Sequence, residues 1–131
     1  SVGGGLGSIS ASEKHAGERI AFGKPLLAQQ AVQRKLVECN RALAGARQLT
    51  WHAARLSDLG SSANETAMQA RIAAVDAMVL AADEAIQIHG GFGYTVEYHV
   101  ERHYRDAKTL EVLDGGSDIL RDRLAAASYS K

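Results

Sequence analysis

The sequence has few of the residues that would give it a disulfide, an extreme charge or a membrane span. Its 131 residues contain one cysteine, Cys39, so no internal disulfide can form, and we expect a reducing compartment, the cytoplasm. Fifteen basic residues balance fifteen acidic residues, which excludes the strongly positive surface that nucleic acid or an anionic membrane requires. No apolar run reaches the roughly 18 residues of a membrane-spanning helix, and residues 1–10 lack the pattern of a signal peptide.

Proline and aromatic residues are also scarce, and this scarcity favours helices. The one proline, Pro25, leaves long segments without a helix breaker, and aromatic residues make up only 5% of the chain. Alanine is abundant, and its small side chain lets neighbouring helices approach closely. Hydrophobic residues make up 46% of the sequence, so we expect residues 1–131 to form a single domain around one core. The first residue is not methionine, which indicates a fragment or a processed chain.

Two long amphipathic helices are predicted from apolar residues that recur at steps of three and four. The first should end near Leu59, before Gly60, and the second should begin at a capping box formed by Ser62 and Glu65. The apolar face of the first helix consists of Val32, Leu36, Cys39, Leu43, Ala46, Thr50, Ala53 and Leu56. The face of the second has the alternating steps typical of an antiparallel bundle and consists of Met68, Ile72, Val75, Val79, Ala82 and Ile86.

The remaining segments are shorter. By propensity alone, residues 1–7 are a flexible leader, and a helix follows over residues 9–22 until Gly23 and Pro25 interrupt it. A fourth helix is predicted over residues 97–110, a sharp turn over residues 114–117, and a last helix from there to about residue 127. The sequence therefore predicts an all-α fold, an antiparallel up-and-down four-helix bundle with a short extra C-terminal helix.

Two groups of residues are candidates for holding a phosphate or a nucleotide. Gly90 and Gly91 are either a helix cap or a place where a ligand approaches the bare backbone. No G-x-G-x-x-G motif follows a strand, which excludes a Rossmann fold. Arg19 and Phe22 are either exposed residues at a helix end or a pair that holds a pyrophosphate and packs against a base, with Gln30 within possible reach.

Other polar residues have simpler explanations. His99 and His103 have the i, i+4 spacing of two metal ligands, but no third ligand has a recognisable spacing, so we predict no metal site. Arg105 and Asp106 are predicted to form a structural ion pair. Asp114 precedes two glycines and is by itself a turn residue, so any chemistry that it performs depends on its neighbours.

Two blocks of sequence, in order and at the right spacing, resemble acyl-CoA dehydrogenases. The first covers residues 18–25 (ERIAFGKP) and continues through Gln30 and Gln33, and the second covers residues 87–121. Enzymes of this family are flavoproteins that remove a proton and a hydride from adjacent carbons of an acyl thioester. The resemblance covers the C-terminal part of a typical member, without its N-terminal helical domain and middle β domain. It implies bound FAD, an acyl-CoA or acyl carrier protein substrate, and assembly into a dimer or tetramer of identical chains.

The resemblance also implies roles for individual residues. Asp114 falls on the position of the catalytic base, where most members carry glutamate, and a carboxylate there would accept the alpha proton. Its side chain reaches about 1.5 Å less far than glutamate. Gly116 replaces a common threonine, which removes one side-chain hydrogen bond to FAD. The residues implied to contact FAD are Arg19, Phe22, Gln30, Gln87, Gly90, Gly91, Gly116, Ser117 and Asp118.

Two alternatives to this catalytic role stay open. Asp114 and Gly116 depart from the family pattern, as a non-catalytic homologue that serves assembly or binds a flavin or thioester would. In some members the base lies on an earlier helix, which would precede Ser1 in this sequence. A helical bundle unrelated to the family is a third reading, which the two matching blocks disfavour.

Where the resemblance and local propensity differ, the resemblance sets our expectation. It aligns residues 1–7 with part of the first bundle helix, so we expect a helix from about Val2 despite the glycines. His99 stands where a proline usually opens the fourth helical segment, so we expect the start of that helix to differ.

Overall fold

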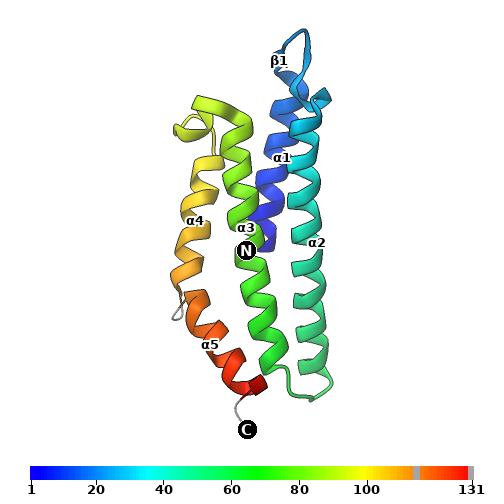
Figure 1. The fold of residues 1–131 in the computed structure, drawn as a ribbon, viewed down its shortest axis with the longest axis vertical. Helices are drawn as coiled ribbons and strands as arrows, with labels where there is room; N and C mark the ends of the chain where they lie inside the picture. Colours follow the sequence, from blue (N-terminus) through cyan, green and yellow to red (C-terminus); the bar gives the residue numbers. More distant parts are fainter. Residues whose placement is uncertain (114–115, 130–131) are drawn as a thin grey trace.

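The computed structural model describes residues 1–113 and 116–129, and in this part of the chain helices pack side by side (Figure 1). The helices are α1 (Val2–Glu18), α2 (Gln30–Asp58), α3 (Asn64–His89), α4 (Val100–Val112) and α5 (Gly116–Tyr129). They are connected by the strands β1 (Ile20–Ala21) and β2 (Lys24–Pro25) and by the 3-10 turns η1 (Leu26–Ala28) and η2 (Gly90–Tyr94). Helices α1 to α4 alternate in direction, which confirms the predicted all-α bundle.

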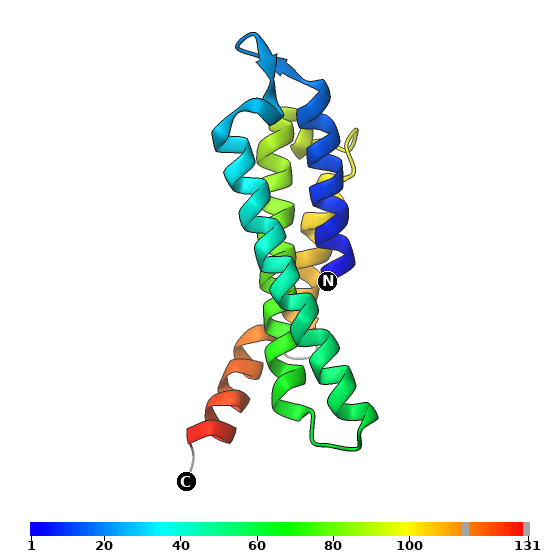
Figure 2. The same cartoon turned by 90° about the vertical axis from the view of Figure 1, so that its right-hand side faces the viewer.

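Helix α3 is the centre of the structure, because every other α-helix packs against it. Helices α1 and α4 flank one part of α3, and α5 lies beside the other part (Figure 1). Turned by 90°, the structure shows α5 diverging from the lower ends of α2 and α3 (Figure 2), and α5 packs against α3 and α4. In the described part of the chain, no helix is long and apolar enough to cross a membrane.

The predicted apolar stripe of α3 describes only part of its buried surface. Val75 and Ala82 are buried as predicted, but Val79 and Ile86 are only half-buried. The helix is instead buried through a series of alanines on more than one face, Ala70, Ala74, Ala77, Ala81, Ala82 and Ala85. A helix with neighbours on several sides has no single apolar stripe, and alanine lets those neighbours come close.

The predicted face of α2 is the buried face. Leu36, Cys39 and Leu43 lie in the main core cluster together with Ile9 of α1 and Ala77 of α3. Thr50 was also predicted to lie on this face, but it is exposed, and its hydroxyl donates to the Ala46 carbonyl within the helix. A helix at the edge of a bundle has one apolar face, so its periodicity is a reliable signal.

Helix α1 begins at Val2, so the helix expected from the resemblance is confirmed and the flexible leader expected from propensity is wrong. A Cβ atom added at Gly5 would lie 2.6 Å from Cδ2 of Leu43, so a larger residue would push α1 away from α2. Gly5 is therefore needed for the contact between two helices, and the packing of Leu43 compensates for its low helix propensity.

The end of α1 differs from the prediction. The helix stops at Glu18, and residues 20–25 form a small hairpin in which Ile20 pairs with Pro25 and Ala21 with Lys24. The two turn residues, Phe22 and Gly23, have φ angles of 55° and 79°. Two positive φ angles in a two-residue hairpin loop are typical of a type I′ turn, which usually takes Asn-Gly. A phenylalanine with positive φ is disfavoured, and propensity therefore did not predict this turn.

The other helix ends also depart from the predicted positions. Helix α3 begins at Asn64 after Ala63 with no side-chain hydrogen bond at its cap, so the capping box of Ser62 and Glu65 is wrong. Helix α4 starts at Val100, later than predicted, because η2 and a turn occupy the residues between it and α3. Helix α5 extends two residues further than predicted and has 14 residues, one more than the 13 of α4.

Candidate functional site

A cavity of about 700 Å³ lies at the end of the bundle where α1 ends and α3 meets η2. Three of the residues predicted to contact FAD, Arg19, Gly90 and Gly91, line this cavity. Figure 1 shows how the fold brings them together, because the hairpin after α1 and the turn after α3 lie at the same end of the molecule. Arg19 and Gly90 are about 70 residues apart in the sequence. The antiparallel packing of the helices brings them to the same end of the bundle.

The two glycines of the cavity have different reasons to be glycine. Gly90 has a φ angle of 65°, and its N–H donates to the Gln87 carbonyl, so it ends α3 in a conformation that suits glycine. Gly91 has no positive φ, and a Cβ atom there would meet nothing within 4 Å. Neither its conformation nor its packing against the described residues explains Gly91, and its bare backbone borders the cavity.

Gly93 has a packing role that the sequence analysis did not assign. A Cβ atom at Gly93 would lie 2.6 Å from the carbonyl oxygen of Ile86 and 2.8 Å from Cβ of His89. We therefore expect Gly93→Ala to lower the free energy of unfolding by about 1–3 kcal/mol, because the turn would move off α3. The matched control, Gly91→Ala, has room for its methyl group and should change stability by less than about 0.5 kcal/mol. Urea unfolding of the 131-residue chain measures both, and equal values would contradict this account of Gly93.

Aromatic residues form one wall of the cavity. His15 of α1 stacks on His89 of α3 with ring centroids 4.3 Å apart, and Tyr98 lies within 5.6 Å of both rings. His89 is buried, and its Nδ1 lies 2.7 Å from the Ala85 carbonyl oxygen. A carbonyl can only accept, so this nitrogen carries a proton and donates.

The surroundings of His15 in this wall favour its neutral form. Burial lowers the pKa of His15 from its ordinary value of 6.5, and the neighbouring His89 and Arg19 lower it further, while Glu18 opposes this effect. Neutral His15 can stack on His89 without repulsion between two cations. The sequence analysis did not identify His15, His89 or Tyr98, and the only available signal was the place of His89 directly before Gly90.

Three other residues predicted to contact FAD do not line this cavity. Phe22 lies at the tip of the hairpin and is 95% exposed. Gln30 is exposed at the first residue of α2, and Gln87 is exposed on the last turn of α3. All three lie at the same end of the bundle as the cavity, and their side chains are open to a molecule outside this chain.

The remaining predicted residues lie at the junction of α4 and α5. Gly116, Ser117 and Asp118 line a second cavity of about 410 Å³ together with Glu111 and Val112 of α4. Gly116 has a φ of 79°, and its added Cβ would lie 3.1 Å from the Glu111 carbonyl oxygen. Asp114, the predicted base, lies outside the described residues.

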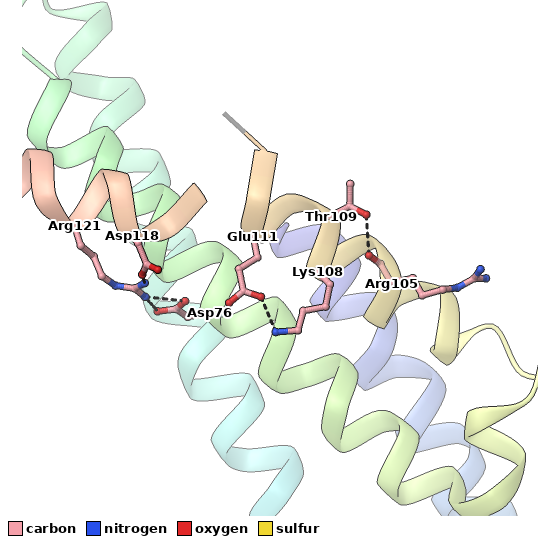
Figure 3. A network of polar contacts seen from close by, with 7 residues as sticks. All are labelled: Asp76, Arg105, Lys108, Thr109, Glu111, Asp118 and Arg121. Atoms are coloured by element: carbon pink, nitrogen blue, oxygen red, sulfur yellow. Dashed lines mark hydrogen bonds and ion pairs between the residues drawn. The ribbon is translucent and has the colours of Figure 1, made fainter. Parts of the chain in front are cut away.

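Polar contacts fix the start of α5 against α3. Arg121 donates from Nη2 to both carboxylate oxygens of Asp76, at 3.0 and 3.2 Å, and from Nη1 to Asp118 at 3.2 Å (Figure 3). On α4, Lys108 pairs with Glu111 at 2.6 Å. Asp118 is therefore oriented by a guanidinium although its side chain is 98% exposed.

Two other side chains of α4, Arg105 and His103, make contacts that the sequence analysis did not predict. Arg105 pairs with Glu101 at 2.8 Å, one helical turn away, and the predicted pair with Asp106 is not among the ion pairs of the described residues. His103 has its Nδ1 2.9 Å from the Ser8 hydroxyl of α1. In residues 1–113 and 116–129, no three His, Cys, Asp or Glu side chains are grouped as a metal would require.

The two groups of predicted residues are separated within one chain. Helix α4 lies between the end cavity and the α4–α5 junction (Figure 1), and its 13 residues correspond to about 20 Å of helix. Neither of the two cavities is lined by residues of both groups. A ligand that uses both groups therefore has to be long or has to bind between two chains.

Comparison with known proteins gives consistent matches over nearly the whole chain. A family model described as "Acyl-CoA dehydrogenase, C-terminal domain" matches residues 3–129. The mitochondrial short-chain specific acyl-CoA dehydrogenase of Homo sapiens is 42% identical over 114 residues, which are 87% of this chain and 28% of that protein. Among solved structures, butyryl-CoA dehydrogenase from Megasphaera elsdenii has a TM-score of 0.93 and 31% identity, over 96% of this chain and 33% of that one. Glutaryl-coenzyme A dehydrogenase in complex with glutaryl-CoA has a TM-score of 0.91 and 31% identity, over 98% of this chain and 33% of that one. The chain thus spans about a third or less of the length of these relatives.

Proposed function

Because the chain belongs to the acyl-CoA dehydrogenase family, we propose that it is the C-terminal domain of an FAD-dependent acyl-thioester dehydrogenase. The observation that carries this proposal is the match of residues 3–129 to the C-terminal domain of that family. In the proposed reaction, the alpha carbon of an acyl thioester loses a proton and the beta carbon loses a hydride, which leaves a carbon–carbon double bond. We propose that residues 1–131 are one domain of a longer protein, and we call this longer protein the complete enzyme.

FAD is the cofactor of this family, and when bound it accepts the hydride. The residues at the end of the bundle fit parts of such a molecule. Arg19 supplies a fixed positive charge at the cavity, where a pyrophosphate would be held. Between η1 and α2, at the same end of the bundle but outside the lining of the cavity, Nε2 of Gln29 is buried without a hydrogen-bond partner among the described residues. A buried donor without a partner is unfavourable, and an acceptor supplied by a ligand would satisfy it.

The exposed hairpin tip also fits a binding role. Phe22 holds a positive φ of 55° and leaves its ring in solvent, so it stabilises neither the turn nor the core. Strained backbone of this kind is typical of binding loops. We propose that the ring packs against the flat part of the cofactor, while Gln30, Gln87 and Gly91 contact it from α2 and from the end of α3.

We propose that Asp114 is the base and that Gly116, Ser117 and Asp118 contact the cofactor beside it. A carboxylate accepts the alpha proton best when its pKa approaches the working pH. Because aspartate reaches less far than glutamate, residues 111–118 have to bring the carboxylate closer to the substrate. A non-catalytic homologue that only binds a flavin or thioester is the alternative, and the departures from the family pattern at residues 114 and 116 favour it.

The proposed partners follow from the names of the relatives and from the separation between the residues at the end cavity and those at the α4–α5 junction. The substrate would be an acyl-CoA, as the names of the relatives indicate for those proteins, or the corresponding acyl carrier protein thioester. We propose a homo-oligomer, a dimer or a tetramer, in which the end cavity of one chain and the α4–α5 junction of another hold the same cofactor. A reducing compartment, which we propose to be the cytoplasm, suits the single buried Cys39.

Flavin absorption of the complete enzyme tests the proposed function. We expect the purified protein to contain bound flavin, and we expect an acyl-CoA of suitable length to bleach the flavin absorption under anaerobic conditions. Arg19→Ala should lower the flavin content, because a charge-assisted hydrogen bond to phosphate is lost. Glu13→Ala, an exposed change on α1, the helix that ends directly before Arg19, is the control. Absence of flavin would reject the proposal, and bound flavin that no acyl thioester bleaches would favour the non-catalytic alternative.

A further inference from the structure

Arg71 of α3 holds the end of α4. Its Nη2 atom donates to the carbonyl oxygens of Leu110, at 3.1 Å, and Leu113, at 3.0 Å. The last carbonyls of a helix have no partners within the helix, and a cation at this end is favourable. Arg71 therefore satisfies the end of α4 from a neighbouring helix.

The second of these carbonyls has a particular place in the chain. The carbonyl of Leu113 belongs to the peptide group that joins Leu113 to Asp114. Leu113 has already left the helix, with φ −64° and ψ 144°, and its N–H donates to Thr109. The hydrogen bond from Arg71 is thus made to the extended residue that leads from α4 to Asp114.

The other side of the junction is held by the same helix. Asp76, five residues after Arg71 on α3, binds Arg121 of α5 through both carboxylate oxygens (Figure 3). Both arms of the junction are therefore bound to α3 by charged hydrogen bonds, one through Arg71 and one through Asp76. Hydrogen bonds that involve charged groups are stronger than neutral ones.

We propose that Arg71 is a positioning residue for proton abstraction, because it holds the backbone that leads to Asp114 at a fixed place on α3. This inference rests on the proposed function. Arg71 also places a positive charge beside the carbonyl of Leu113, the residue that precedes Asp114 in the sequence. Among the described residues of the junction, the other charged groups are Lys108 and Glu111 of α4, which pair with each other, and Asp118 and Arg121 of α5, which pair together with Asp76 of α3.

Two variants of Arg71 separate positioning from general stability. Arg71→Met keeps an unbranched apolar side chain but removes the guanidinium with its charge and its donors, whereas Arg71→Lys keeps the charge and a donor. In the complete enzyme, we expect Arg71→Met to lower kcat by about 10- to 100-fold with little change in KM, because a displacement of about 1 Å has such an effect. Arg71→Lys should recover most of the loss. Arg55→Met, an exposed change at the far end of α2, is the control.

The pH profile is a readout that a purely structural role would not change. Loss of a nearby cation raises the pKa of a carboxylate. The acidic limb of kcat/KM should therefore move to higher pH in Arg71→Met and stay in place in Arg71→Lys. Equal losses of kcat in both variants with no movement of this limb would overturn the proposal.

Amide exchange of the 131-residue chain tests the same contact without activity. In Arg71→Met, we expect amides of residues 111–118 to exchange at least about tenfold faster, because a charged hydrogen bond is lost, while amides in the centre of α2 stay unchanged. Unchanged exchange at residues 111–118 would overturn the proposal. If the unmodified complete enzyme shows no dehydrogenation, the proposed function and the catalytic part of this inference both fail, and amide exchange still decides whether Arg71 holds the junction.

Discussion

Asp114→Asn in the complete enzyme is expected to lower kcat for dehydrogenation by about 10²- to 10⁴-fold, the usual contribution of a general base. Asparagine has nearly the same size and shape as aspartate, so it should leave the fold and the flavin content unchanged. Its amide cannot accept the alpha proton at neutral pH. The substrate would still bind, and we expect the loss to appear in kcat and not in KM.

Two further variants complete this test. Asp114→Glu keeps the carboxylate and restores the family residue, so it should retain activity, with a loss of up to about 100-fold if the loop is adapted to the shorter side chain. Asp122→Asn makes the same chemical change at an exposed position of α5 and should leave kcat unaffected. Dehydrogenation that continues at the original rate in Asp114→Asn would remove Asp114 from the mechanism and favour a base elsewhere in the complete enzyme.

Leu43→Ala is expected to lower the free energy of unfolding of the 131-residue chain by about 2–5 kcal/mol. Leu43 is 1% exposed and is one of the largest fully buried side chains. Its removal leaves a cavity between α1 and α2 at the point where Gly5 allows their close approach. Val37→Ala removes a side chain from the same helix that is 66% exposed, and it should change stability by less than about 0.5 kcal/mol. Urea unfolding midpoints measure both changes.

The contact between Leu43 and Gly5 is tested further by combining changes at both residues. Gly5→Ala alone should destabilise the chain, because the new methyl group would meet Leu43 at 2.6 Å. In the Leu43→Ala background the obstacle is gone, and alanine is favoured over glycine in a helix by about 1 kcal/mol. Gly5→Ala should then stabilise the chain, so the effects of the two changes would not add. Additive effects would show that Leu43 does not limit the approach of α1.

The sequence predicted the parts of the fold that depend on one interface and missed those that depend on several. Leu36, Cys39 and Leu43 were identified because α2 has one buried face. The burial of α3 was only partly predicted, because its alanines face several neighbours and carry no periodic signal. The helical start at Val2 came from the resemblance, since local propensity contains no information about the contact of Gly5 with α2.

The residues of the candidate site were likewise predicted only in part. Arg19, Gly90 and Gly91 were predicted from two separate blocks, and the fold places them at one cavity. The stacked pair of His15 and His89 was missed, because the two residues become neighbours only when α1 and α3 pack together. The hairpin turn at Phe22 was missed, because its backbone conformation opposes the preference of its own residue.

The alanines of α3 restrict how this sequence can change over evolutionary time. Ala77 and Ala81 belong to the core shared with α1 and α2, whereas Ala82 and Ala85, equally buried, lie outside that cluster. A larger residue at one of these positions would displace a neighbouring helix, and the neighbours carry the residues of both candidate regions. Drift along α3 is therefore limited by side-chain volume more than by polarity, and a gain of a few methylene groups there would require matching losses on the helices that face it.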